Sequence, residues 1–350
     1  MIDRMPLRPA GCRLLLVAML LCASVGIVSA DGFSLLPEID ERGVHIGYTR
    51  ARHYGLIIPD RETRIFAGAV VSHTRDIDAT LHDPGLGFVL IQNLAGDRIT
   101  GRFQVDLTSR LEAVYRIPDA RQDPAAAVPA GFFLETDAYP LTSGDVGLRF
   151  ITADQYHFPE RAFAARIGGS VAFGFAGEPY ATAHLTGSLR AVIPVFTPNV
   201  QVSLGARYRG YVDPGWLDGS APSSALSYLD LRGYTGAERL AHGASVSADV
   251  TARLPFEIYV PMSAGAGAYA DAGRVSGSPG GLVSGDTANG TQTHGRAVVG
   301  GLVEYRLLAP FRIGSVTLSA GVGALVPDWT LARPWLRIDY RTGLFFADPL

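Results

Sequence analysis

Residues 200–211 form the stretch VQVSLGARYRGY, in which apolar and polar side chains alternate. Val202 and Leu204 share one face of this stretch, whereas Gln201 and Ser203 share the other. A β-strand points successive side chains to opposite faces of its sheet, so an alternation with a period of two predicts a strand. We therefore expect residues 200–211 to form a strand with one apolar face and one polar face.

The same alternation recurs along the chain, which predicts an all-β protein of roughly 13 to 16 strands. Further examples are GRFQVDLT (101–108), RLEAVYRI (110–117), AHLTGSLRAVI (183–193), SVSADVTARL (245–254), SVTLSAGVGA (315–324) and WLRIDYRTGL (335–344). Bacterial single-chain membrane barrels have even strand numbers, so we expect 16 strands, with 14 as the alternative.

Two architectures fit this pattern: a soluble sandwich or barrel, and a transmembrane antiparallel β-barrel with a polar interior. Many of the alternating stretches reach ten residues, which matches the about 9–11 residues of a tilted membrane strand. Their polar faces contain Arg, Asp and Glu, as expected where lipid lies outside the barrel and water or paired charge inside. The membrane barrel is the favoured fold class, and the soluble sandwich remains the alternative.

Three segments are expected along the chain. Residues 1–30 resemble a secretory signal peptide, with arginines before an apolar run and small residues at the expected cleavage position. Residues 31–42 are expected to be a short N-terminal tail, and residues 43–350 the barrel. Export of a membrane barrel predicts the bacterial outer membrane as its location.

Several classes of function are disfavoured by the composition and the motifs. A formal net charge of −3 is unlike the strongly basic domains that bind nucleic acid. Both cysteines, Cys12 and Cys22, fall in the expected signal peptide. The sequence contains neither His-Glu-x-x-His nor Gly-x-Ser-x-Gly. We therefore expect no enzyme activity, no metal site and no cofactor.

The longest loop rich in Gly, Ser, Pro and Asp, at residues 213–236, contains Arg232-Gly233-Tyr234. Further along, the alternation in MSAGAGAYADAGRV (262–275) places Tyr269, Asp271 and Gly273 on the inward face, among other glycines. Glycine in a strand often marks the close approach of another backbone segment. We therefore expect the loop to fold into the barrel, where Arg232 would bind Asp271 through its guanidinium fork.

These residues resemble a known family, the BamA/TamA superfamily of outer-membrane barrels, also called the bacterial surface antigen family, which includes the two-partner-secretion transporters. Leu231-Arg232-Gly233-Tyr234 resembles the Arg-Gly-aromatic tip of its inward-folded loop, and residues 249–255 resemble the polar strand that follows. Tyr269-Ala270-Asp271-Ala272-Gly273 is similar to its aromatic-x-Asp-x-Gly motif. The resemblance covers roughly residues 199–347. It implies 16 strands, an Arg–Asp contact that holds the loop inside, and a weak seam between the first and last strands.

The expected site is a loop–lumen lock, formed by Arg232, Gly233, Tyr234, Tyr269, Asp271 and Gly273, with Asp249 and Arg253 as supporting polar residues of the lumen. Trp335, Phe345 and Phe346 are expected in an aromatic girdle at the membrane interface.

The sequence differs from the family pattern at Thr251, where many members have Glu, and it ends with Ala-Asp-Pro-Leu after Phe346. We also expect a short form of the family, without POTRA domains. The resemblance implies a role in protein or lipid insertion or transport at the outer membrane. Outer-membrane lipid and a periplasmic partner or client are the expected partners. The alternatives are a passive diffusion pore and a structural barrel that binds a periplasmic or surface partner.

Overall fold

The computed structural model describes residues 33–342 with gaps at 41–42, 55–56, 60, 76–78, 98–102, 121–131, 154–160, 213–219, 230, 235–238, 259, 278–291 and 309–313. The expected signal peptide at residues 1–30 lies outside the described residues, as do Phe345 and Phe346.

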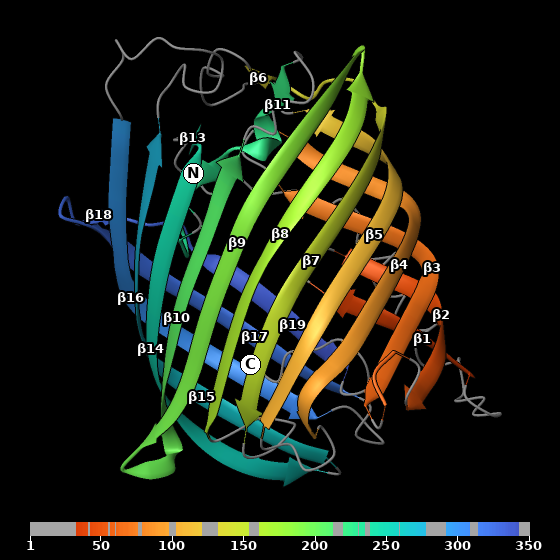
Figure 1. The fold of residues 1–350 in the computed structure, drawn as a ribbon. Helices are drawn as coiled ribbons and strands as arrows, with labels where there is room; N and C mark the ends of the chain where they lie inside the picture. The colour runs from red at the N-terminus through yellow and green to blue at the C-terminus, as the bar shows by residue number, and fades with distance from the viewer. Residues whose placement is uncertain are drawn as a thin grey trace.

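One 15-stranded antiparallel sheet forms the body of the protein (Figure 1). Its strands follow the order of the sequence, because each long strand pairs with the next one along the chain. They are β1 (Phe33–Asp40), β2 (Gly43–Tyr54), β3 (Glu62–Arg75), β4 (Ala79–Asp97), β5 (Phe103–Ala120), β7 (Tyr139–Ala153), β8 (Ala162–Ala176), β9 (Glu178–Val195), β10 (Thr197–Val212), β14 (His242–Ile258), β15 (Val260–Gly277), β16 (Gln292–Leu308), β17 (Gly314–Val326), β18 (Thr330–Leu331) and β19 (Trp335–Thr342).

Fourteen of these strands have eight residues or more, and β18 has only two. The described part of the chain therefore has 14 long strands, which is the lower of the two expected numbers, 16 and 14. Within the segment expected as a tail, residues 31–42, Phe33–Asp40 form a strand that pairs with β2 along its whole length. Two adjacent leucines and Pro37 interrupt its alternation in the sequence. Proline is tolerated there because β1 stands at an end of the sheet order.

The sheet curls into a barrel, with β5 and β7–β9 on the near side in Figure 1, β14 and β16 at the left edge, and β17 and β19 behind the near strands. Its two ends meet, because β1 and β19 approach each other with Cα atoms within 8 Å. Along the described backbone, β1 pairs with β2 and β19 pairs with β17, and no ladder joins β1 to β19. This junction is hereafter the β1–β19 seam.

The polarity of the barrel is inverted relative to that of a soluble protein. Large apolar side chains cover its outside, such as Leu254 at 75% exposure and Ile167 at 68%. Polar side chains are buried inside, with Thr63 and Asp106 both at 0% exposure. An apolar exterior around a polar interior is the arrangement of a transmembrane β-barrel, and this is the fold of the protein. Among the described residues, no helix is long and apolar enough to cross a membrane.

Short elements between the long strands fold inward. They are β6 (Phe132–Phe133), β11 (Ala221–Pro222), the 3₁₀-helix η1 (Ser223–Ala225), β12 (Ser227–Tyr228) and β13 (Arg239–Leu240). Figure 1 shows β6 and β11 near the upper mouth of the barrel, where they pair in parallel. The described part of the loop between β10 and β14, residues 220–229 and 231–234, is hereafter the inner loop. Its residues Ser223, Leu226 and Leu231 are buried.

Candidate functional site

Two acidic side chains project into the lumen from neighbouring strands. In the ladder between β14 and β15, Asp249 stands opposite Tyr269, and Asp271 stands opposite Ser247. Asp271 is 5% exposed, whereas its neighbours Ala270 and Ala272 face outward and are exposed. The period of two along β15 thus places this carboxylate in the lumen, as the sequence predicts.

Arg232 of the inner loop binds both carboxylates. Its backbone N–H and its Nε both donate to Oδ2 of Asp271, at 3.0 and 2.8 Å, and its Nη2 donates to Oδ1. Its Nη1 donates to Oδ1 of Asp249. The fork of the guanidinium matches a carboxylate in this way, and such charge-assisted bonds are stronger than neutral ones. The contact fixes the inner loop to the inner faces of β14 and β15.

Two aromatic rings enclose the guanidinium of Arg232. Its Cζ lies 4.3 Å from the ring centroid of Tyr269 and 5.6 Å from that of Trp335. The indole Nε1 of Trp335 donates to the hydroxyl of Tyr269 at 3.0 Å, and the two rings meet edge to face. A cation near an aromatic ring is attracted by its quadrupole. Trp335 therefore connects the last long strand to the loop–lumen lock.

Glycines on the neighbouring strands make room for the ring of Tyr269. A Cβ atom at Gly300 would lie 2.7 Å from Cε1 of Tyr269, and one at Gly323 would lie 2.6 Å from its hydroxyl. Both distances are too short for real atoms. The ring of Tyr269 therefore lies flat across two strands that have no side chain at the point of contact.

The tip of the inner loop needs glycine for two reasons. Gly233 has φ = 75°, in the left-handed region, and a Cβ atom there would lie 2.4 Å from the carbonyl oxygen of Arg333. The backbone N–H of Arg333 donates to the carbonyl of Gly233 at 2.9 Å. The turn also includes a bond from the N–H of Tyr234 to the carbonyl of Leu231 at 3.1 Å.

An apolar cluster surrounds the charged contact. Leu229 and Leu231 of the inner loop pack with Tyr269, Val298 and Ala332, and Tyr234 packs against this cluster. Gly273 leaves space for the loop, because a Cβ atom there would lie 3.0 Å from Cδ2 of Leu231 and 3.1 Å from Cδ2 of Leu229. The loop is therefore held by apolar packing as well as by charge.

The electrostatics of the lock favour a charged Arg232. Burial alone would lower the pKa of Arg232, but the hydrogen bond to Asp271 and the charges of Asp249 and Asp271 outweigh it and raise that pKa. Arg232 therefore stays protonated, and the inner loop remains attracted to the wall.

The six residues of the expected lock, Arg232, Gly233, Tyr234, Tyr269, Asp271 and Gly273, lie at one place in the structure, and Asp249 lies there too. Arg253 lies apart from them: its Nε donates to Oε1 of Glu304 at 2.7 Å, and its Nη2 to the hydroxyl of Thr251 at 3.0 Å.

The expectation for Trp335 was wrong, because its indole packs inside against Tyr269 and not in an interfacial girdle. The alternation held a sign of this, because Trp335 shares the phase of Arg337 and Asp339 and not that of Leu336.

A second network, which the sequence did not predict, holds the inner loop near β6. Nε and Nη2 of Arg116 donate to the two oxygens of Asp83 at 2.8 and 2.7 Å. Its Nη1 donates to Oε1 of Glu135 at 3.2 Å and to Oγ of Ser224 at 3.4 Å. The hydroxyl of Tyr139 also donates to Glu135. Arg116 therefore joins the wall, the segment after β6 and the inner loop.

In the part of the chain that the structure describes, no group of three or more His, Cys, Asp or Glu side chains is placed to hold a metal ion. What the site provides is a salt-bridged, aromatic contact between a loop and a barrel wall. Such a contact can fix the loop in the lumen or release it.

Comparison with solved structures finds a similar fold. The chain resembles the crystal structure of BamA from Haemophilus ducreyi lacking POTRA domains 1-3, with a TM-score of 0.51 and 13% sequence identity. The match covers 85% of this chain and 62% of that chain, so this chain spans less than two thirds of the BamA chain. No protein-family model matches the chain, and no curated protein matches its sequence. The likeness therefore concerns the fold, which is that of a BamA-like barrel.

Proposed function

We propose that this protein is an outer-membrane barrel of the BamA type that acts in inserting or transporting protein or lipid at the outer membrane. The observation that supports this most directly is the inner loop, which Arg232 fixes to Asp271 and Asp249 inside a BamA-like barrel. The sequence resemblance stated above rests on the same residues. No enzymatic step is part of the proposal.

The β1–β19 seam supports the same role. Strands β1 and β19, each described over eight residues, stand at the two ends of the sheet. They approach each other without a described ladder of backbone hydrogen bonds. Unpaired strand edges can accept another strand. A client strand, or lipid, would therefore enter the membrane at this seam, with a periplasmic partner delivering the client.

The test is a folding assay with the full chain in lipid vesicles. An urea-unfolded, eight-stranded outer-membrane barrel is added as the client, and its folding is followed by the shift in gel mobility. We expect faster client folding than in vesicles that contain a general porin at the same density. Equal rates in both vesicles, together with a large and steady conductance of this protein, would favour the passive pore.

A further inference from the structure

The hairpin formed by β9 and β10 reaches beyond the strands on either side of it. The described ladder between β8 and β9 ends at Val192, and the one between β10 and β14 begins at Val200. The hairpin's own ladder continues to Val195 opposite Thr197. Figure 1 shows the hairpin projecting at the lower left of the barrel, at the end opposite to β6 and β11. Residues 193–199 are hereafter the hairpin tip.

Phe196 stands at the apex of the hairpin tip in a conformation that is rare for a bulky residue. Its φ is 64°, in the left-handed region, and its side chain is 101% exposed. Gly, Asn and Asp are the usual residues at positive φ in a hairpin turn, because a larger side chain is strained there. Full exposure of a phenyl ring to water is also unfavourable. A strained backbone thus presents a large apolar group to the surroundings of the barrel.

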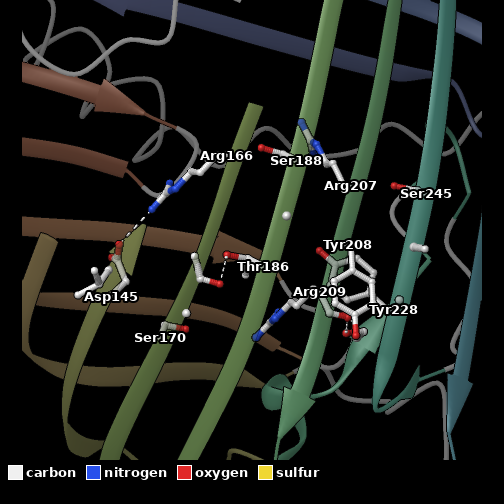
Figure 2. Close-up of a pocket in the computed structure, with 17 residues that line it drawn as sticks. Asp145, Arg166, Ser170, Thr186, Ser188, Arg207, Tyr208, Arg209, Tyr228 and Ser245 are labelled. Carbon is white, nitrogen blue, oxygen red and sulfur yellow. Dashed lines mark hydrogen bonds and ion pairs between the residues drawn. The ribbon is translucent and has the colours of Figure 1, made fainter. Parts of the chain in front are cut away.

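The two faces of the hairpin have opposite polarity. Leu185 and Leu189 of β9 are exposed on the outward face, at 55% and 41%. Figure 2 shows the other face, where Thr186 and Ser188 of β9 and Arg207 of β10 line a cavity inside the barrel. The outward face of β9 is therefore part of the apolar, lipid-facing exterior.

This apolar exterior continues into the hairpin tip. Ile193, four residues after Leu189, lies on the same face and is 49% exposed. Residues 191–201, AVIPVFTPNVQ, include no charged side chain. A hairpin turn that stands in water would be expected to contain polar turn residues at its apex. The surface that contacts lipid along the wall thus extends to Phe196 without interruption by charge.

Outward aromatic side chains lie at the same end of the barrel on both sides of the hairpin. On one side, Phe103 of β5, Phe150 of β7 and Phe163 of β8 meet edge to face. On the other side, the ring centroids of Phe256 of β14 and Tyr305 of β16 are 6.2 Å apart. Aromatic girdles of this kind lie at the membrane interfaces of outer-membrane barrels. These five residues therefore mark the interface at this end.

Phe196 lies between these two groups, because β9 and β10 stand between β8 and β14 in the sheet. Apart from Phe196, residues 185–207 contain no aromatic side chain. The ring at the apex is thus the one aromatic group with which this hairpin can continue the girdle. Barrel strands are tilted, so one height in the membrane falls at different ladder positions on successive strands.

We propose that the hairpin tip is a lipid anchor, in which the ring of Phe196 lies at the boundary between the headgroups and the acyl chains. The uninterrupted apolar face and the girdle on either side favour lipid as the occupant over a soluble protein or a second copy of the chain. The proposal goes beyond the insertion or transport role and requires only the barrel fold.

The experiment measures the fluorescence quenching of Phe196→Trp, in the refolded full chain, in phosphatidylcholine vesicles. The lipid has bromine on its acyl chains either near the headgroup or near the bilayer centre, and iodide is supplied on both sides of the membrane. The signal of the wild type, which has three tryptophans, is subtracted. We expect bromine near the headgroup to quench several-fold more than bromine near the bilayer centre, and more than iodide.

Two variants calibrate the depth. Leu189→Trp, on the outward face of β9, should be quenched by bromolipid and not by iodide. Asp137→Trp, at an exposed position between β6 and β7, should be quenched by iodide alone. If Phe196→Trp behaved like Asp137→Trp, the hairpin tip would stand in water and the proposal would be overturned. Protection of Phe196→Trp from both quenchers would also overturn it, because a second copy of the chain would then cover the tip.

A second measurement covers the case in which Phe196→Trp does not fold, which heat-modifiable gel mobility shows. Phe196→Cys is labelled with a nitroxide, in a chain in which Cys12 and Cys22 are replaced by serine. Oxygen concentrates in lipid, so it should relax the nitroxide more strongly than a water-soluble nickel complex does. Stronger relaxation by the nickel complex would contradict the anchor.

Discussion

Arg232 is joined to Asp271 by both its backbone and its side chain. The backbone N–H and Nε share Oδ2 of Asp271, while Nη2 binds Oδ1. The backbone bond does not depend on the arginine side chain, so replacing Arg232 removes the charge but leaves one link to the wall. Asp271, by contrast, is the acceptor of all three bonds. The two single substitutions are therefore not equivalent.

The first prediction concerns the coupling between these residues. Breaking a buried ion pair costs about 3–5 kcal/mol, and Arg232 is 20% exposed, so we expect Arg232→Ala to lose about 3 kcal/mol of unfolding free energy. In double-mutant cycles, the coupling of Arg232 with Asp271 should exceed that with Asp249, which accepts one bond. Urea titration in vesicles measures the unfolding free energy of each variant, from which both couplings follow. Equal couplings would contradict the described geometry.

The second prediction concerns the tip of the inner loop. A left-handed conformation costs a residue with a Cβ atom about 1–2 kcal/mol. At Gly233 the close approach of Arg333 adds to this, and overpacking typically costs about 1–3 kcal/mol. We therefore expect Gly233→Ala to lose more unfolding free energy than the matched control Gly177→Ala. Gly177 has φ = 82° and nothing within 4 Å of its Cβ position.

Urea titration measures the unfolding free energy of both glycine variants. The loss in Gly233→Ala minus the loss in Gly177→Ala is the cost of the close approach to Arg333. Similar losses in both variants would show that the tip of the inner loop does not touch the backbone at Arg333. A larger loss in Gly177→Ala would count against the described loop altogether.

The third prediction uses two adjacent glycines that face opposite sides of β16. A Cβ atom at Gly300 would lie 2.2 Å from the carbonyl oxygen of Val322 and 2.7 Å from the ring of Tyr269, whereas one at Gly301 has its nearest neighbour, the carbonyl of Gly267, at 3.8 Å. We expect Gly300→Ala to lower the unfolding free energy by about 1–3 kcal/mol and Gly301→Ala to leave it nearly unchanged. If the order of the two variants were reversed, Gly300 would not face the crowded inner side of β16, where the Val322 carbonyl and the Tyr269 ring lie.

Much of this geometry follows from the sequence because the period of two is a local property of a strand. Alternation alone places Tyr269 and Asp271 on one face of β15 and Ala268 and Ala270 on the other, and the structure has the same faces. Contacts between distant elements are different, since no local pattern encodes them. Ser224 and Arg116, for example, are 108 residues apart in the chain.

Two other outcomes show where local patterns are insufficient. Alternation places Trp335 on the polar face of its strand, with Arg337 and Asp339. Its partner Tyr269 lies 66 residues away in the chain, and no local pattern identifies that contact. Arg253 lies in a polar strand beside the lock, but its partner Glu304 comes from 51 residues further on. Which carboxylate an arginine of the lumen binds depends on the register of strands that the sequence does not specify.

The fourth prediction concerns the network around Arg116. Loss of its guanidinium removes the bonds to Glu135 and to Ser224, so Arg116→Gln should loosen the inner loop near η1. We expect hydrogen–deuterium exchange at residues 223–226 to become about tenfold faster. Arg274→Gln, at an exposed arginine of β15, should not change it. Unchanged exchange in Arg116→Gln would show that the loop is held there by packing alone.

The central claim is that the inner loop occupies the lumen and that Arg232 holds it there. Single-channel conductance in a planar bilayer tests it most directly, with the refolded wild type beside Arg232→Ala and with Arg274→Gln as the control. We predict a low, flickering conductance for the wild type and the control, and a larger, steadier one for Arg232→Ala. A large, steady conductance that is the same in all three proteins would contradict the claim.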